Sequence, residues 1–274
     1  MKWVRNLGLV AVLFAIVVYF GLPRALTAMG LNPAYDMPDF NLADKRVLII
    51  TTSQATLGEG GKATGVYGSE LTVPYYAFLD GGLTVDVASI KGGAIPVEPY
   101  SMGWPLAAAE DYRFLKDTVA MAKLTNSIPI TAVDIGKYDA VFLSGGWGAA
   151  YDFGQSTVLG ALITAANAEG AVLGSVCHGA LGFLQAKNPD GTAFLQGRHV
   201  TAVTDRQITQ LGVEITPLHP EREVRAAGAL FQNQTAFRDI FATGVVVDGR
   251  LVTGQNQNSG PETAARMMEL LDQQ

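Results

Sequence analysis

The only cysteine of this chain lies in the sequence Val176-Cys177-His178-Gly179. The apolar residues 171–176 before it predict a buried strand, and residues 178–185 after it predict a short helix. A cysteine at such a strand-to-helix turn has the geometry of a nucleophile elbow. Because a helix N-terminus favours negative charge, we expect the pKa of this thiol to be lowered. The simpler alternative is a small buried thiol without a chemical role, since free cysteine is among the most buried residue types.

A cysteine nucleophile needs a proton acceptor, donors for a developing oxyanion and a pocket. The backbone N–H groups of Gly146 and His178 are the natural oxyanion donors, because both follow predicted strand ends. His178 is also a candidate base, although neighbours at the start of a helix do not face each other well. Glu70, at the start of a predicted helix, is the third candidate. Each candidate also has a simpler explanation. Gly145-Gly146 could form only a tight turn, and Glu70 could only complement the helix dipole.

The elements that must position these groups alternate along the chain. Apolar runs predict strands at 45–52, 83–89, 138–143 and 171–176, and helical spacing predicts helices at 69–79, 107–124 and 158–168. The Asp-Gly pair at 248–249 predicts a hairpin, and residues 259–262 have the sequence of a capping box for the last helix.

Strands that are apolar throughout and alternate with helices predict an α/β fold with a mostly parallel sheet covered on both faces. Ligand sites in such sheets lie at the carboxyl ends of the strands. Cys177 and the Gly145-Gly146 loop both follow such ends, so we expect them to lie close together.

Composition excludes several classes of function. The net charge is −6 and only 16% of the residues are charged, so a basic stripe for nucleic acid is absent and we expect no nucleic-acid partner. One cysteine in 274 residues excludes an intrachain disulfide and a cysteine-cluster metal site. We therefore expect neither a metal ion nor a cofactor.

The N-terminus predicts a membrane anchor. Residues 7–22 form a charge-free apolar run behind Lys2 and Arg5, and Arg24 closes it. The run approaches the roughly 20 residues that span a bilayer and exceeds the signal-peptide core of about 7–15 residues. Residues 26–28 match a cleavage site poorly, so we favour an uncleaved signal anchor over a cleaved signal peptide or a buried soluble helix. Lys2 and Arg5 place the N-terminus in the cytoplasm.

This topology places the remainder of the chain on the periplasmic or extracytoplasmic side. We expect three parts: a signal anchor or transmembrane helix at 1–29, a tether at 30–44 with prolines at 33 and 38, and one α/β domain at 45–274. About 245 residues after the anchor are enough for one domain with a sizeable core.

Several ordered motifs resemble one known family. They are Thr-Gly-Val-Tyr-Gly-Ser-Glu at 64–70, Tyr-Asp-Ala-Val-Phe-Leu-Ser-Gly-Gly at 138–146, Val-Cys-His-Gly-Ala at 176–180 and Asp-Gly-Arg-Leu-Val-Thr-Gly-Gln-Asn at 248–256. With these motifs the chain resembles the ThiJ/PfpI family of the class I glutamine amidotransferase-like superfamily, and within it the branch of chaperone-like glyoxalase III enzymes. The resemblance covers residues 45–272.

The resemblance implies a flavodoxin-like three-layer α/β sandwich. It implies that Cys177 is the nucleophile, that Glu70 hydrogen-bonds its sulfur and that His178 completes the pair. It also implies a small aldehyde substrate, because members of that branch convert methylglyoxal to lactate without glutathione. Family members are often dimers, which leaves a homodimer open.

Two departures from the family pattern bear on the site. Many members have Gly-Gly-His-Gly where this chain has Gly145-Gly146-Trp147-Gly148, so the pocket loses a proton acceptor and becomes more apolar. A third, acidic member of a catalytic triad has no clear match, and Asp205, after a further predicted strand, is the candidate. The chain has only the histidines His178, His199 and His219, which do not match the metal sites of some relatives.

Three functions remain open at this stage. The first is a Cys177-dependent glyoxalase III-like hydro-lyase that acts on small reactive aldehydes. The second is a cysteine hydrolase, an amidase, peptidase or deglycase that uses the same nucleophile. The third is a membrane-tethered holdase chaperone whose thiol senses oxidation.

Overall fold

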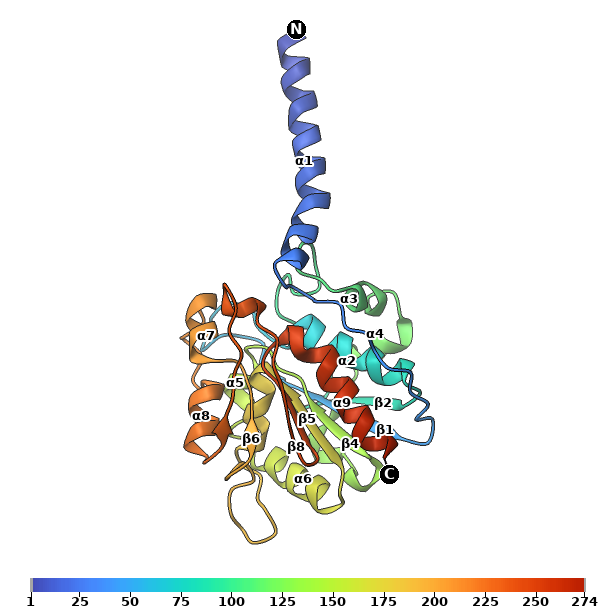
Figure 1. Cartoon of the computed structure of the whole chain (residues 1–274), viewed down its shortest axis with the longest axis vertical. Coiled ribbons are helices and arrows are strands. Elements are labelled where there is room, and N and C mark those ends of the chain that lie inside the picture. The colour runs from blue at the N-terminus through green and yellow to red at the C-terminus, as the bar shows by residue number, and fades with distance from the viewer. Residues whose placement is uncertain (1, 274) are drawn as a thin grey trace.

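The computed structural model describes residues 2–273, with side chains from Asn6 onward. The chain forms a three-layer α/β sandwich from which one long helix projects (Figure 1). The central sheet has seven strands in the order β3-β2-β1-β4-β5-β9-β8. These are β1 (Arg46–Thr51), β2 (Thr84–Ser89), β3 (Ile128–Pro129), β4 (Ala140–Leu143), β5 (Val172–Val176), β8 (Val245–Asp248) and β9 (Leu251–Gly254).

All neighbouring strands of this sheet are parallel except β8, which pairs antiparallel with β9. The mostly parallel sheet, the three-layer fold and the hairpin around residues 248–249 are thus confirmed. A separate two-stranded sheet pairs β6 (His199–Val200) with β7 (Leu230–Phe231).

Helices cover both faces of the central sheet. The first face carries α2 (Gly68–Asp80) and α9 (Gly260–Asp272), with α3 (Ala109–Phe114) and α4 (Thr118–Thr125) beyond them. The second carries α5 (Ala149–Asp152), α6 (Thr157–Ala168), the 3₁₀ helix η3 (Cys177–Phe183) and α8 (Pro220–Ala226). The strands are buried on both sides because alternate residues enter two separate cores.

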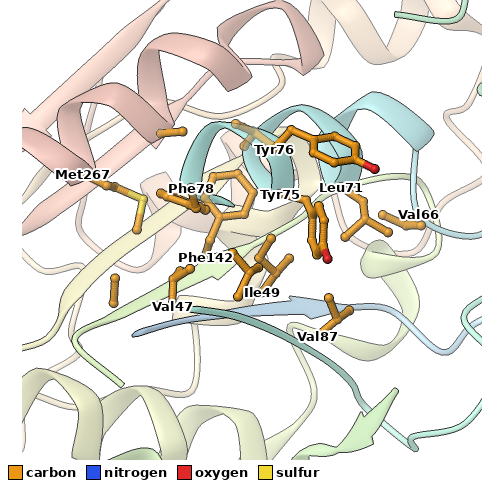
Figure 2. Close-up of a cluster of buried hydrophobic side chains, with 14 of the residues drawn as sticks. Val47, Ile49, Val66, Leu71, Tyr75, Tyr76, Phe78, Val87, Phe142 and Met267 are labelled. Carbon is orange, nitrogen blue, oxygen red and sulfur yellow. The ribbon is translucent and has the colours of Figure 1, made fainter. Parts of the chain in front are cut away.

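Phe142 of β4 lies at the centre of the first core. Figure 2 shows it beneath α2, with Phe78 and Ile49 beside it. The rings of Phe78 and Phe142 meet edge to face with their centroids 5.9 Å apart, and both side chains are fully buried. Such aromatic pairs add to the free energy gained by burying their apolar area.

Two local expectations were wrong. The helix expected at 107–124 is broken into α3 and α4, because the Asp117 side chain accepts hydrogen bonds from the N–H groups of Val119 and Ala120 and starts a new helix. The capping box at 259–262 does not form. Ser259 already has helical backbone angles and makes no cap hydrogen bond, and its hydroxyl accepts from the N–H of Gly244 instead.

The projecting helix α1 (Lys2–Ala28) is long and apolar enough to cross a bilayer over residues 6–28, and none of its most apolar window is buried in the protein. The charges of Lys2 and Arg5 lie outside the residues whose side chains are described. The following segment, expected as a tether, packs on the domain: Leu31 and Leu42 are buried, and the N–H of Asn32 donates to Asn258 Oδ1 at 2.9 Å.

The Phe142 contact predicts a stability effect. Phe142→Ala should lower the free energy of unfolding by about 3–5 kcal/mol, because it leaves a cavity between the sheet and α2. Denaturant titration of the full chain in detergent measures this loss. Val119→Ala is the control, since Val119 is 63% exposed on α4. A loss below about 1 kcal/mol for Phe142→Ala would contradict the described packing.

Candidate active site

The backbone reverses at Cys177, between β5 and η3. Cys177 has φ of 56°, in the left-handed region that non-glycine residues rarely adopt. This reversal is the expected nucleophile elbow, and a residue held in such a strained conformation needs close packing around it. Gly179 provides part of that packing, because a Cβ there would come 2.1 Å from the carbonyl oxygen of Leu143.

The loop after β4 lies directly against the elbow. A Cβ on Gly145 would come 2.2 Å from Glu70 Oε2 and 2.9 Å from Cys177 Cβ. Gly146 has φ of 96°, and a Cβ on it would come 2.4 Å from the carbonyl oxygen of Gly65. The two glycines therefore allow this loop, the segment at Gly65 and the first turn of α2 to meet at the elbow. A role in a tight turn alone would not require such close contacts.

Glu70 stands in the first turn of α2 with its side chain buried against this loop. Burial raises the pKa of Glu70 to about 8, and the neighbouring Cys177 thiol and the N–H groups of Gly145 and Gly146 oppose that rise. The carboxyl and the thiol are therefore close neighbours, and Glu70 Oε2 has no hydrogen-bond partner among the described residues. A carboxyl with this pKa is mostly protonated at neutral pH and can both give and take a proton near pH 8.

The expected lowering of the thiol pKa was wrong. Burial raises the pKa of Cys177 well above its ordinary value, and the nearby Glu70 carboxylate raises it further. The nearby N–H groups of His178 and Gly146 act in the opposite direction, because their dipoles favour the thiolate. Desolvation outweighs these donors, as it does for thiols in apolar surroundings.

His178 contacts the thiol in spite of its adjacent position. Its Nδ1 lies 3.4 Å from Cys177 Sγ, because the left-handed turn at Cys177 breaks the regular helical spacing. Burial, together with the neighbouring His219, lowers the pKa of His178 to about 3. The imidazole is thus neutral and can accept the thiol proton at Nδ1.

Asp205 is not brought to His178. It begins α7 (Asp205–Leu211), and its carboxylate lies 3.6 Å from His219 Nδ1 and 3.7 Å from an Arg222 nitrogen. His178 Nε2 is buried and has no hydrogen-bond partner among the described residues. The structure therefore pairs Asp205 with His219 and does not show the contact that a third triad member would make.

Glu98 is a further site residue that the sequence did not indicate. Its buried carboxylate accepts from the Thr64 hydroxyl at 2.5 Å and from the N–H of Trp147 at 3.1 Å, and burial raises its pKa. Glu98 thereby fixes the loop that carries Gly146. The only signal in the sequence was a lone acid between prolines at 96 and 99 in an otherwise apolar loop.

These groups line the base of a cavity of about 590 Å³. Trp147 forms part of its wall, as the Gly-Gly-Trp-Gly sequence indicated, and Cys177, Glu70 and Gly146 line it as well. Among residues 2–273, no cluster of three or more His, Cys, Asp or Glu side chains could hold a metal ion. The cavity thus exposes a thiol beside a carboxyl and the Gly146 backbone, with the buried His178 imidazole 3.4 Å from the sulfur, which suits covalent addition to a carbonyl carbon.

Known proteins are similar to this chain in sequence and in fold. A model of the DJ-1/PfpI family matches residues 62–270. A probable glutathione-independent glyoxalase of Schizosaccharomyces pombe is 29% identical over 77% of this chain and 92% of its own. Glyoxalase 3 of Candida albicans is 28% identical over 80% of this chain and 95% of its own.

Solved structures agree with these matches. The crystal structure of glyoxalase III from Candida albicans superposes with a TM-score of 0.74 at 26% identity, over 83% of this chain and 98% of that one. The Rapid Encystment Protein of Francisella tularensis gives a TM-score of 0.77 at 28% identity, over 83% and 99% of the two chains.

The Glu70 carboxylate predicts the reactivity of the thiol. Glu70→Gln removes a negative charge that raises the pKa of Cys177, so the pH midpoint of alkylation by iodoacetamide should fall by about one unit or more. Intact mass follows the reaction, because Cys177 is the only cysteine. Glu169→Gln at the end of α6 is the exposed control. An unchanged or higher midpoint in Glu70→Gln would contradict the electrostatic coupling.

Proposed function

Because the chain belongs to the DJ-1/PfpI family, we propose that it converts methylglyoxal-type aldehydes into 2-hydroxy acids without glutathione, with Cys177 as nucleophile. One observation carries this proposal: Glu70, His178 Nδ1 and the N–H groups of Gly146 and His178 all surround one sulfur at the base of a cavity. The relatives named glutathione-independent glyoxalases support the reaction type.

The first step is addition of sulfur to the aldehyde carbon. Neutral His178 takes the thiol proton at Nδ1 while Cys177 Sγ bonds to that carbon. The electron pair of the C=O bond moves to oxygen, and the N–H groups of Gly146 and His178 stabilise the oxyanion. Protonated His178 then returns the proton to this oxygen, which gives a neutral hemithioacetal.

The second step moves a proton between the two carbons. The Glu70 carboxylate removes the hydrogen of the former aldehyde carbon as a proton, which leaves an enediolate. Protonated Glu70 returns this proton to the neighbouring carbon, and the hydroxyl proton of the former aldehyde carbon passes to the oxygen of that neighbouring carbon. The product is a 2-hydroxyacyl thioester on Cys177. Water then attacks the thioester carbonyl, which releases the hydroxy acid and restores the thiol. The sum is addition of one water molecule to the 2-oxoaldehyde, with no external oxidant or reductant.

The alternatives use the same thiol but find less support. A redox-sensing holdase needs an exposed thiol with a low pKa, whereas Cys177 is buried and its pKa is raised. Amide hydrolysis needs a donor that protonates the leaving amine. Neutral His178 becomes such a donor once it has taken the thiol proton, so a cysteine hydrolase is the second candidate.

We further propose that α1 anchors the protein in a membrane, with the domain on the periplasmic or extracytoplasmic side. The apolar composition of residues 6–28 and the absence of buried residues from their most apolar window support the anchor, and the charges at Lys2 and Arg5 support the orientation.

The proposed reaction predicts a simple assay. The full chain should produce lactate from methylglyoxal without glutathione, and Cys177→Ala should produce none, because no other thiol is present. Folded wild-type protein that forms no lactate would refute the glyoxalase proposal and favour the hydrolase.

Glu70 predicts the pH dependence. Its carboxylate is the active base and burial raises its pKa to about 8, so turnover should rise with pH through about pH 8. Glu70→Gln should lower kcat by about 10²–10⁴-fold, the usual contribution of a general base, and should remove this rise. Steady-state rates are measured between about pH 6 and pH 9, a range that brackets the pKa of Glu70. Unchanged turnover would remove Glu70 from the mechanism.

The anchor is tested by fractionation. The native protein should stay with the membrane after a high-salt wash and keep its N-terminus, because apolar burial does not weaken with ionic strength. A soluble periplasmic form that begins near residue 29 would show a cleaved signal peptide instead.

A further inference from the structure

The cavity above Cys177 is joined to the base of α1. Leu31, three residues after the last residue of α1, forms part of the cavity wall. Gly30 lies against Phe241, another wall residue, because a Cβ on Gly30 would come 3.2 Å from the Phe241 carbonyl oxygen. The Asn32 side chain donates to the carbonyl oxygen of Leu106, which also lines the cavity. The chain leaving α1 is therefore built into the substrate cavity.

A second contact joins α1 to the same wall. The indole N–H of Trp104 donates to the Tyr19 carbonyl oxygen at 2.9 Å, and the two rings stack with centroids 5.7 Å apart. Trp104 belongs to the loop between Tyr100 and Leu106, both of which line the cavity. Tyr and Trp side chains favour the membrane–water interface. The loop therefore lies alongside α1, on the side of the domain from which α1 leaves.

The exposed residues that line the cavity, its rim, are mostly apolar, with Lys62 as the charged exception. Tyr100 is 82% exposed and Leu211, at the end of α7, is 43% exposed, although both line the cavity. Figure 1 places α7 at the same end of the domain as the base of α1. The rim therefore faces the side from which the membrane helix leaves.

The walls of the cavity are also apolar. The lining includes the apolar side chains of Leu31, Leu57, Leu106, Trp147, Ile240 and Phe241, with the amides of Gln207, Asn256 and Gln257 among them. A volume of about 590 Å³ falls in the range of sites that enclose drug-sized ligands. Methylglyoxal has three carbons, so its single methyl group would leave most of this apolar surface without contact.

We infer that the preferred substrate is an amphiphilic 2-oxoaldehyde with a long apolar chain, which enters from the membrane surface with its aldehyde toward Cys177. This inference rests on the proposed function and specifies its substrate class. The reacting dicarbonyl reaches the thiol and the N–H donors beside it. The chain contacts the apolar walls and leaves through the rim beside α1.

The test is a series of alkylglyoxals whose side chain grows from methyl to hexyl to decyl. The full chain is reconstituted in phosphatidylcholine vesicles, and kcat/KM is measured for each aldehyde against Cys177→Ala. Each buried methylene contributes about 0.8 kcal/mol, or roughly fourfold in kcat/KM. We expect kcat/KM to increase by at least about 100-fold from methyl to hexyl, since part of the chain stays exposed.

A pair of matched variants locates the effect in the cavity. Leu211→Gln should lower kcat/KM for decylglyoxal by about fivefold, through the loss of apolar contact at the rim, and should change methylglyoxal turnover much less. Val158→Gln on α6 is the control, because Val158 is 44% exposed and does not line the cavity. An equal effect of Leu211→Gln on both aldehydes would contradict chain binding at the rim.

The outcomes separate the inference from the proposed function. If kcat/KM is constant or falls as the chain lengthens while methylglyoxal is converted, the substrate class is wrong and the glyoxalase proposal stands. If no aldehyde of the series is converted by the folded protein, the proposed function itself fails.

Discussion

The reversed backbone at Cys177 is the constraint on which the site depends. A φ of 56° at this residue turns the chain sharply from β5 into η3 and directs the thiol into the cavity. This conformation is costly for a residue with a side chain, so the surrounding segments must hold it. They can do so because Gly145, Gly146 and Gly179 have no Cβ, and each packs at a distance that a methyl group would prevent. Backbone geometry thus places the thiol, the carboxyl and the N–H donors together.

The close packing has an electrostatic consequence. Burial raises the pKa of both Glu70 and Cys177, so each holds its proton at neutral pH and neither carries an unpaired buried charge. The same burial keeps His178 neutral, with its Nδ1 beside the thiol. The N–H groups of Gly146 and His178 lower the pKa of the thiol, so they favour negative charge at this position. In the proposed mechanism, protons therefore move between neighbouring groups during the reaction, and Cys177 is a neutral thiol before it.

The sequence predicted the parts of this arrangement that depend on local pattern. Apolar runs located the strands, and one cysteine at the end of such a run located the elbow. The sign of the thiol pKa shift was wrong, because a helix-dipole argument contains no measure of burial. Glu98 was missed because its partners, Thr64 and the N–H of Trp147, come from distant segments. Asp205 follows a predicted strand as expected, but its contact with His219 depends on how residues 212–219 fold back, which local pattern does not specify.

The cavity that Cys177 lines also includes Leu31, just beyond α1, so the proposed chemistry and the proposed membrane anchor are physically linked. The central claim is that carbon bonds to Cys177 Sγ during turnover. Rapid acid quenching of the full chain with methylglyoxal, followed by mass analysis of the peptide that contains Cys177, tests it most directly. The account predicts a 2-hydroxyacyl thioester on Cys177 that appears before free lactate and is absent from Cys177→Ala. Lactate formed while Cys177 stays unmodified at every quench time would contradict it.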